Sequence, residues 1–595
     1  MDTEEGYDSF LREAARVTDA AAVVSARPMA PGTRLANERF ELLRTLGQGG
    51  MGVVYAARDH LRGGEVALKT LQAVTLDALE RLRGEFVTLH DLSHPNLVSL
   101  GELAEDDGRW FFTMELVDGP DFLGHVRPAG VLDATRLRAA AGQLVTGLAF
   151  LHASGKVHRD IKPSNVLVAG GRVVLLDFGL AADAGKGGIG AGTFGYMAPE
   201  QADGGAVSPA ADWYAFGAML WEVLAGRLPF VGPPLEVLAR KREGAPPLPA
   251  DAAEAGGDLG ALVVALLDPD PARRPDGVEV ARALGVAVPP RPPMPRFVGR
   301  VAERALLGTR FAAAREASRA VLVRGPSGIG KSALVSAFVD EARGGGALVI
   351  VDRCHERVAV PFKGLHGIAA DLARHLDEDR EARTAALDGP DLGLLIAALP
   401  GLALHGELAR AGRGAPHVRD PIERRGRVFD AFAGMLGRLA AQQPLVLAID
   451  DVQWADRDGL GLLDHVLASV RRGLFVVSTA PDGALVDAAW SARAETIDVG
   501  PLAPADAAAL GAALDGGDVG ALVDEAAGHP LHLAELVALR RAGASGLRLE
   551  DAIAARVRAL APAPARLLEL VALAGAPLPQ ALLAGAAGLD GAAWW

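Results

Sequence analysis

The stretch HRDIKPSN at residues 158–165, followed by VVLLDFG at residues 173–179, decides the fold expected for the first half of this chain. The first stretch carries a carboxylate, Asp160, and an amide, Asn165, and the second ends an apolar strand with the carboxylate of Asp177. A protein that catalyses phosphoryl transfer mainly positions the reacting groups and stabilises charge. One carboxylate can orient the attacking hydroxyl, while an amide and a second carboxylate hold Mg²⁺ against the phosphates. The pattern therefore predicts a phosphoryl-transfer site in which Asp160 is the orienting base.

Length and composition indicate a large globular protein. The 595 residues are too many for one hydrophobic core, and 50% of them are hydrophobic while 23% are charged. A net charge of -14 argues against a general nucleic-acid binder, because an acidic surface repels phosphate backbones. The single cysteine, Cys354, excludes an internal disulfide and is expected to be a small buried residue in a reducing compartment. No secretory pattern opens the chain and no run of about 18 apolar residues follows, so we expect a cytoplasmic protein without a membrane span.

Two β-rich runs begin at Phe40 in FELLRTLGQGGMGVVYAARD and are separated by glycines, which is typical of a hairpin. Its glycines form the pattern GxGxxG, and without a Cβ they let backbone N–H groups approach phosphate oxygens. The nucleotide-binding residues expected on this hairpin are Gly47, Gln48, Gly49, Gly50, Gly52 and Val54, the last of which would cover adenine. Such a pattern alone is commonly only a turn, but VALK at residues 66–69 follows as an apolar strand whose lysine, Lys69, can clamp the α and β phosphates.

The next segments supply partners for that lysine and for adenine. Glu85 lies in a helical stretch from which its carboxylate can pair with Lys69 and orient the ammonium. WFFTMELVDGP at residues 110–120 is an apolar strand that runs into a polar turn, which suits a segment joining two lobes. The backbone groups of Glu115 and Val117 in this segment are expected to contact adenine.

Residues 40 to about 284 resemble a bacterial eukaryotic-like (Hanks-type) serine/threonine protein kinase. The motifs that carry the resemblance are GQGGMG, Lys69, Glu85, HRDIKPSN, DFG, GTFGYMAPE at residues 192–200, DWYAFGAMLWE at residues 212–222 and DPARRP with Arg274. The resemblance implies transfer of the γ-phosphoryl group of ATP to protein hydroxyls. The roles that it implies are catalysis for Lys69, Glu85, Asp160 and Lys162, metal binding for Asn165 and Asp177, an ion pair of Glu200 with Arg274, and anchoring of the catalytic loop by Asp212.

One departure from the family pattern lies in the activation segment, Asp177 to Glu200. It reads DFGLAADAGKGGIGAGTFGYMAPE, and no Ser, Thr or Tyr lies between Asp177 and Thr193. Many related kinases order this segment by pairing a phosphate there with the arginine that precedes the catalytic aspartate, here Arg159. We therefore hypothesise that phosphorylation within residues 178–192 does not switch the activity, and that control comes from elsewhere in the chain.

A second nucleotide-binding pattern follows a proline-dense stretch at residues 286–296, which is expected to be an extended linker. VLVRGPSGIGKSALVSAF at residues 321–338 is an apolar strand, a glycine loop and a helix, and GPSGIGKS satisfies the pattern GxxxxGK(S/T) in that context. The loop backbone would cradle phosphates, Lys331 would reach the β and γ groups, and Ser332 would ligate Mg²⁺. The binding residues expected here are Gly325, Gly328, Gly330, Lys331 and Ser332.

The partner of this loop is expected to be an apolar strand ending in acids, and QPLVLAIDDVQWAD at residues 443–456 supplies it. Asp450 can hold Mg²⁺ through water and Asp451 can orient a hydrolytic water, although either could be only an acidic strand end. Together the two motifs resemble the P-loop ATPases of the STAND and AAA-like group. Three further features agree with this resemblance: FVGR at residues 297–300, Trp454, and AAGHPLHLAEL at residues 526–536, which has His529 where that group has Asn.

The second domain departs from this group at LFVVSTAPDG, residues 474–483. Relatives often place an arginine shortly after a strand-end threonine, whereas Thr479 is followed by Ala480 and Pro481. We therefore expect nucleotide binding in this domain and at most slow hydrolysis.

These patterns predict a multidomain protein of the α+β and α/β classes, with a bilobal protein kinase fold, a P-loop domain with a parallel sheet, and a small helical or winged-helix segment. The expected divisions are a mobile leader at residues 1–36, the kinase domain at 37–285, the linker at 286–296, the P-loop ATPase domain at 297–545 and the last segment at 546–595. Relatives of the second domain usually continue into helical repeats or other sensor modules, so truncation after Trp595 stays open.

The expected function is ATP-dependent and Mg²⁺-dependent phosphorylation of protein serine and threonine hydroxyls in bacterial signal transduction, with the second nucleotide-binding module as a regulatory switch. An upstream signalling partner would act at the ATPase domain or the C-terminal region. The alternative is a signal-responsive STAND-type ATPase or regulatory scaffold in which the kinase domain is secondary or non-catalytic. The intact Lys69, Asp160, Asn165 and Asp177 argue against a non-catalytic scaffold, and no basic recognition helix supports a DNA-binding regulator.

Overall fold

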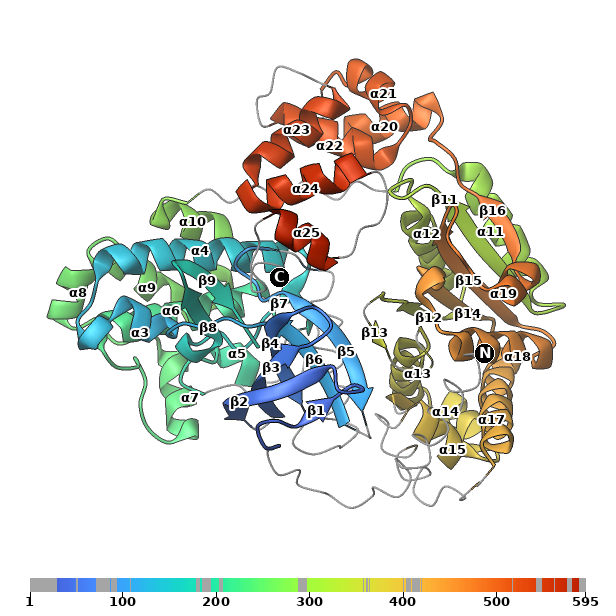
Figure 1. Ribbon diagram of the computed structural model, residues 1–595, viewed down its shortest axis with the longest axis horizontal. Helices are drawn as coiled ribbons and strands as arrows, with labels where there is room; N and C mark the ends of the chain where they lie inside the picture. Colours follow the sequence, from blue (N-terminus) through green and yellow to red (C-terminus); the bar gives the residue numbers. More distant parts are fainter. Residues whose placement is uncertain are drawn as a thin grey trace.

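The computed structural model contains one sheet-based unit in each half of the chain, followed by a set of helices (Figure 1). It describes residues 29–49, 52–70, 86, 92, 94–106, 109–177, 182–183, 194–202, 207–286, 297–356, 358–359, 362, 364–399, 401–402, 408, 418, 420–515, 517–541, 548–560, 562–574 and 580–587. The expected leader up to residue 28, linker residues 287–296, and the predicted site residues Gly50 and Glu85 lie outside these ranges. Among the described residues, no helix has both the length and the apolar character needed to cross a bilayer.

The first sheet is built around the hairpin that the glycine pattern predicts. Its strands are β1 (Arg34–Leu35), β2 (Phe40–Gly49), β3 (Gly52–Asp59), β4 (Gly64–Thr70), β5 (Leu100–Asp106) and β6 (Arg109–Glu115). They pair antiparallel in the order β1-β2-β3-β4-β6-β5. Alternate side chains, among them Tyr55, Leu68 and Phe111, are buried together on one face. The register sets Val54 of the hairpin opposite Lys69 of β4, so the glycine loop and the lysine lie side by side.

A mainly helical lobe follows. Its helices are α3 (Phe122–Val126), α4 (Ala134–Ala153), α5 (Pro199–Ala202), α6 (Pro209–Ala225), α7 (Pro234–Glu243), α8 (Ala250–Gly256), α9 (Leu259–Leu266) and α10 (Gly277–Leu284). Its short strands are β7 (Lys156–Val157), β8 (Val166–Ala169), β9 (Arg172–Leu175) and β10 (Ala182–Asp183), and it has 3-10 turns at Pro128–Gly130, Pro163–Asn165 and Pro271–Arg273. Helix α6 is apolar on nearly every side and is accordingly buried in the middle of the lobe.

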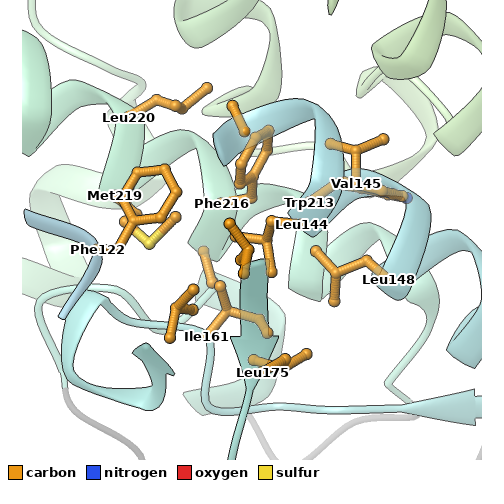
Figure 2. Close-up of a cluster of buried hydrophobic side chains, with 14 of the residues drawn as sticks. Phe122, Leu144, Val145, Leu148, Ile161, Leu175, Trp213, Phe216, Met219 and Leu220 are labelled. Atoms are coloured by element: carbon orange, nitrogen blue, oxygen red, sulfur yellow. The ribbon is translucent and has the colours of Figure 1, made fainter. Parts of the chain in front are cut away.

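The core of this lobe holds the catalytic loop in place. Figure 2 shows Leu144 of α4, Phe216 of α6 and Leu175 of β9 in one cluster with Ile161. All four side chains are fully buried. Because Ile161 directly follows Asp160 in the sequence, burial of its side chain fixes the backbone from which the predicted base projects.

The second unit is a parallel sheet with helices on both faces. Its strands are β11 (Arg319–Gly325), β12 (Leu348–Arg353), β14 (Leu445–Asp450), β15 (Leu474–Pro481) and β16 (Glu495–Asp498), in the order β12-β14-β15-β11-β16. Alternate residues of β14 enter two different hydrophobic clusters: Leu447 lies in one and Val446 in the other. Burial on both faces explains why the central strands are almost continuously apolar.

Helices surround and follow this sheet. Those of the second unit are α11 (Val301–Ala313), α12 (Lys331–Gly344), α13 (His366–Glu378), α14 (Arg380–Leu387), α15 (Leu392–Ala398), α17 (Pro421–Gln442), α18 (Arg457–Ser469) and α19 (Ala488–Arg493), with a 3-10 turn at Val452–Trp454. After them come α20 (Pro504–Asp515), α21 (Gly520–Ala526), α22 (Pro530–Arg541), α23 (Leu549–Ala559), α24 (Pro562–Ala574) and α25 (Gln580–Ala587). The described residues from 548 onward form helices and no strand, which favours the helical over the winged-helix interpretation of this segment.

A strand pairing and a ring contact join the two sheet-based units, and neither was predicted. Strand β13 (Val358–Ala359) belongs to the second half of the chain but pairs in parallel with β5 of the first sheet, Val358 opposite Leu103 (Figure 1). Nearby, the ring of Trp110 on β6 meets the ring of His366 edge to face, with 6.5 Å between the centroids. The segment between β12 and α13 therefore extends the first sheet by one strand.

Candidate active site and second nucleotide site

Three residues of the catalytic loop converge as the HRDIKPSN stretch predicts. Lys162 Nζ lies 2.6 Å from Asp160 Oδ2. Asn165 Nδ2 donates to the same carboxylate oxygen at 3.0 Å and to the Asp160 backbone oxygen at 2.8 Å. Because the amide nitrogen of Asn165 is used in this way, its amide oxygen is the atom left to ligate a metal.

A buried carboxylate holds the loop from below. Asp212 of α6 has no exposed surface and accepts hydrogen bonds from the backbone N–H of His158 at 2.8 Å and of Arg159 at 2.7 Å. It also lies 2.8 Å from His152 Nε2. Burial opposes ionisation of Asp212, but these donors lower the pKa of its carboxyl below the usual value. Asp212 thus anchors the backbone just before Asp160, which is the role that the resemblance implies.

Lys69 connects the first sheet to the second predicted metal ligand. Its Nζ lies 2.7 Å from Asp177 Oδ1, and the lysine is almost fully buried. Burial opposes ionisation of Asp177, but the Lys69 charge outweighs this effect and lowers the pKa of the carboxyl. Glu85, which was expected to pair with Lys69, lies outside the described residues, so that pairing stays a prediction.

The residues expected to contact adenine lie at the end of β6. Glu115 is buried, and its carboxylate accepts two hydrogen bonds from Arg172 at 2.8 Å each and one from the backbone N–H of Ser99 at 3.0 Å. Val117 follows as a half-buried residue outside the strand. Sequence reasoning missed Arg172, whose only signal is its place at the start of a short strand beside the catalytic loop. The Glu115 side chain is held by these three hydrogen bonds, and the contact of its backbone with adenine stays a prediction.

The predicted glycine loop of the second domain forms between β11 and α12. Lys331 Nζ is buried and donates to the backbone oxygens of Gly325 and Pro326, at 2.9 Å each. Burial lowers the pKa of Lys331, while the nearby carboxylates Asp450 and Asp451 act in the opposite direction. At Gly325 a Cβ would lie 2.4 Å from the Val499 backbone oxygen, so no other residue fits there. Gly328 and Gly330 have φ of +76° and +98°, which glycine adopts without strain.

The acidic strand end meets this loop. Ser332 Oγ lies 2.9 Å from both carboxylate oxygens of Asp450, so the two predicted metal ligands are adjacent. The Thr479 hydroxyl of β15 also donates to Asp450, and the backbone N–H of Asp451 donates to the Thr479 oxygen at 3.0 Å. Thr479 therefore links both acids to the next strand, although no arginine follows it.

An arginine reaches these acids from another strand. Arg353, the last residue of β12, places Nη2 2.8 Å and Nε 3.0 Å from Asp451 Oδ2, and Nε 3.8 Å from Asp450 Oδ2. Sequence reasoning missed it. The sequence does not show that β12 and β14 are neighbouring parallel strands with Arg353 opposite Asp450 in register. The carboxyl ends of such neighbouring strands meet at one edge of the sheet, which is why the arginine reaches the acids.

The remaining motifs of this domain also converge on the glycine loop. Arg300 of the FVGR segment donates to the Ile329 backbone oxygen at 3.0 Å. His529 Nε2 lies 3.0 Å from the Ser327 backbone oxygen, and a Cβ at Gly328 would meet Leu531 at 2.7 Å. The start of α22 therefore packs directly on the loop that is expected to bind phosphate.

The ion pair that the resemblance implies in the helical lobe is present. Arg274 forms a bidentate ion pair with Glu200, at 2.7 and 2.9 Å. Thr193 and most of the residues between it and Asp177 lie outside the described ranges, so the hypothesis about that segment stays a prediction. Cys354 is buried, as expected.

The fold and these two sites define a protein kinase domain followed by a P-loop ATPase domain. Family models agree, since residues 40–281 match the protein kinase domain and residues 296–478 match the AAA ATPase domain. The two domains that the motifs indicate are therefore both present in this chain.

The kinase domain is similar to bacterial serine/threonine kinases. Serine/threonine-protein kinase pkn2 of Myxococcus xanthus is 36% identical over 279 residues, which are 44% of this chain and 34% of that protein. DNA damage-responsive serine/threonine-protein kinase RqkA of Deinococcus radiodurans is 41% identical over 220 residues, 34% of this chain and 32% of that protein. Serine/threonine-protein kinase PknA of Mycobacterium tuberculosis is 34% identical over 289 residues, 45% of this chain and 66% of that protein. The matched part thus spans about a third of the length of the first two relatives.

Proposed function

We propose that this chain is an ATP-dependent protein serine/threonine kinase that acts in bacterial signalling. The observation that carries the proposal is the convergence of Lys162 and Asn165 on the Asp160 carboxylate. In this arrangement Asp160 accepts the hydroxyl proton of a serine or threonine, and Lys162 stabilises the charge that develops on the transferred group. Lys69 holds the α and β phosphates of ATP.

The donor set at this site fits a magnesium ion. Asn165 has its amide oxygen to offer and Asp177 carries an ionised carboxylate, and oxygen ligands of this kind are those that Mg²⁺ prefers. Bound there, Mg²⁺ would neutralise charge on the β and γ phosphates. The ion pair of Lys69 with Asp177 would then keep the metal ligand and the phosphate clamp next to each other.

Transfer of radiolabelled γ-phosphate to the protein itself and to a generic basic protein tests this function. Asp160→Asn is expected to abolish transfer while ATP binding persists, because the amide cannot accept the hydroxyl proton. Asp258→Asn is the matched control, since it makes the same chemical change at an exposed carboxylate. Wild-type protein that binds ATP but transfers no label would favour the non-catalytic scaffold instead.

We further propose that the P-loop domain binds Mg-ATP and acts as a switch on the kinase domain. Ser332 and Asp450 form the expected metal-binding pair, and Lys331 lies in the loop that would hold the phosphates. Arg353 and Thr479 contact the two acids where the γ-phosphate end of a nucleotide is expected. Slow hydrolysis at Asp451 would reset the switch.

A continuous set of contacts supports coupling of this site to the kinase domain. Arg353 ends β12, and β13 begins five positions later and pairs with β5, where Val358 is opposite Leu103. Leu103 is in turn opposite Phe112 of β6. The Phe112 ring lies 5.8 Å from that of Phe86, the residue after Glu85, and 5.9 Å from Lys69 Nζ. A change in the Arg353 contacts would therefore alter the packing of residues that neighbour Lys69 and Glu85, the predicted ion pair that holds the phosphates.

Variants at the second site test the coupling. Lys331→Ala removes the phosphate-binding ammonium, and Arg353→Met removes the link between the acids and β12. Both are expected to change the rate of protein phosphorylation, whereas Arg353→Lys, which keeps a cation, is expected to change it less. The switch proposal would be contradicted if folded Lys331→Ala and Arg353→Met proteins phosphorylate substrate at the wild-type rate under every input tried. That result would not contradict the proposed kinase activity.

A further inference from the structure

A buried lysine in the kinase domain takes no part in the sites described above. Lys241 lies near the end of α7 and has no exposed surface. Its ammonium donates to three backbone oxygens, those of Phe194 at 2.7 Å, Gly195 at 3.1 Å and Met197 at 2.6 Å. An ammonium has three N–H donors and no acceptor, so these oxygens use its whole hydrogen-bonding capacity.

Aromatic rings enclose the rest of the ammonium. Nζ lies 5.4 Å from the ring centroid of Tyr214 and 5.9 Å from that of Phe230. No carboxylate among the described residues forms an ion pair with it, and burial lowers the pKa of Lys241 to about 7. Burying a cation without an anion costs free energy, which hydrogen bonds must offset. The three hydrogen bonds to backbone oxygens are therefore what stabilises the buried ammonium of Lys241.

Those carbonyl groups belong to residues 194–197, the part of the activation segment that lies just before α5. Gln201 of α5 donates to the backbone oxygen of Arg159 at 3.2 Å, immediately before the catalytic carboxylate. The side chain of Phe194 is 45% exposed. Phe194 thus presents an exposed side chain, and Gly195 and Tyr196 are half-buried beside it, while Met197 is buried. The backbone of residues 194–197 is fixed on one side by Lys241 and, through α5, on the other side by the catalytic loop.

We propose that Lys241 is a positioning residue for the polypeptide substrate: its ammonium holds residues 194–197 as the surface on which the chain flanking the phosphorylated hydroxyl docks. The inference rests on the proposed kinase function. Lys241 touches neither the predicted ATP-binding residues nor Asp160, so its loss acts on protein-substrate binding and not on nucleotide binding. This separation distinguishes positioning from a general loss of stability.

The test compares Lys241→Met with Arg240→Met in the full chain. The first variant keeps an apolar stem and removes the ammonium, and the second removes an exposed cation one residue away on the same helix. Lys241→Met is expected to raise KM for a generic basic protein substrate about tenfold, with kcat and KM for ATP within about twofold of wild type. Arg240→Met is expected to leave all three unchanged.

Two results would overturn the inference: an unchanged protein-substrate KM in Lys241→Met, or a rise in KM for ATP of the same size. Neither result would contradict the proposed kinase function, which is contradicted only if the wild-type protein transfers no phosphate. The two failures are therefore distinguishable in one set of assays.

The wild-type protein offers a second measurement that needs no variant. The titratable and charged groups on the elements packed around Lys241 are Asp212, Tyr214 and Glu222 of α6, Tyr196, the pair Glu200 and Arg274, and Glu236, Arg240, Arg242 and Glu243 of α7 itself. Burial raises the pKa of both tyrosines, so neither titrates near neutrality. As the pH rises through neutrality, Lys241 loses a proton and one of its three donors. Protein-substrate KM is expected to rise between about pH 6 and pH 9 while KM for ATP stays level, and a flat profile would overturn the inference.

Discussion

The Ser332 hydroxyl lies 2.9 Å from both carboxylate oxygens of Asp450, although the two residues are 118 positions apart in the sequence. Ser332 is the second residue of α12, directly after the glycine loop, and Asp450 ends β14. A parallel sheet brings the carboxyl ends of its strands to one edge, where the loops that follow them can meet. The relationship brings together the two residues that are proposed to bind Mg²⁺ in the second domain.

Removing the charge from Asp450 is expected to weaken Mg²⁺-dependent nucleotide binding at this site by about tenfold or more, because magnesium favours anionic oxygen ligands. Titration of Asp450→Asn with ATP, with and without Mg²⁺, measures the loss as the disappearance of one of two binding events. Asp430→Asn, at an exposed carboxylate of α17, is the control. Two undiminished Mg²⁺-dependent binding events in Asp450→Asn would contradict the assignment.

Lys69→Met is expected to lower phosphoryl transfer by roughly 10²–10³-fold, since it removes a preorganised cation from the phosphates. Methionine keeps an apolar stem in the buried position, so the thermal midpoint should change little. Steady-state kinetics with a protein substrate measure the effect. Arg58→Met, at an exposed cation of the neighbouring strand β3, should behave as wild type. Full activity of Lys69→Met would show that another group holds the phosphates.

Arg172→Ala is expected to lower the free energy of unfolding of the kinase domain by about 1–3 kcal/mol, because it leaves the buried Glu115 carboxylate without two hydrogen-bond donors. Urea unfolding followed by tryptophan fluorescence measures the change. Arg138→Ala removes an exposed ion pair with Asp258 and should cost less than about 1 kcal/mol. Equal losses in the two variants would mean that the Glu115 contact contributes no more than a surface pair.

His529 predicts a pH dependence in the second domain. Burial, together with the neighbouring His532, lowers the pKa of His529 below its usual value. In the pH range between the folded and unfolded pKa values, the unfolded chain binds more protons, so stability is present above about pH 6.5 and is lost as the pH falls through the folded pKa. The thermal midpoint of the second domain is expected to fall between about pH 7.5 and pH 5.5, and His529→Asn should reduce that fall. An identical fall in both proteins would exclude His529 as its cause.

The absence of hydroxyl side chains between Asp177 and Thr193 leads to a prediction about regulation. Because no acceptor exists in residues 178–192, thorough phosphatase treatment is expected to leave kinase activity in place. Activity assays before and after treatment, with mass spectrometry to verify dephosphorylation, measure this. Complete loss of activity that returns on rephosphorylation of Thr193 would contradict it.

Local patterns were sufficient to predict much of the fold and of the two sites. The hairpin from Phe40, the strand that carries Lys69 and the strand–loop–helix around Lys331 all form as expected. Each pattern combines a backbone requirement, such as glycine at a phosphate loop, with an apolar period that a short window displays. The roles assigned to Gly50 and Glu85 stay predictions, since both residues lie outside the described ranges.

Other contacts could not be predicted, because they join residues whose own neighbourhoods carry no signal. Lys241 lies in the basic run ARKRE at the end of a helix, where solvent exposure is the ordinary expectation, yet it is the buried donor to residues 194–197. Arg172 likewise looks like an ordinary strand residue until Glu115 is placed beside it. Such roles depend on which distant segment packs against the side chain.

By itself, the sequence determined the two domain types and the predicted chemistry: which side chains would take part in phosphoryl transfer, which loops would hold phosphates, and which strands carry them. These properties are local, because they follow from residue type and short spacing. Only the tertiary structure decided that β13 extends the kinase sheet at Leu103, that Arg353 meets Asp451, and that Lys241 is buried against three carbonyl groups. The physical reason is that an edge strand offers unpaired backbone groups, and a long cation offers donors, to any partner within reach. Packing of the whole chain selects that partner.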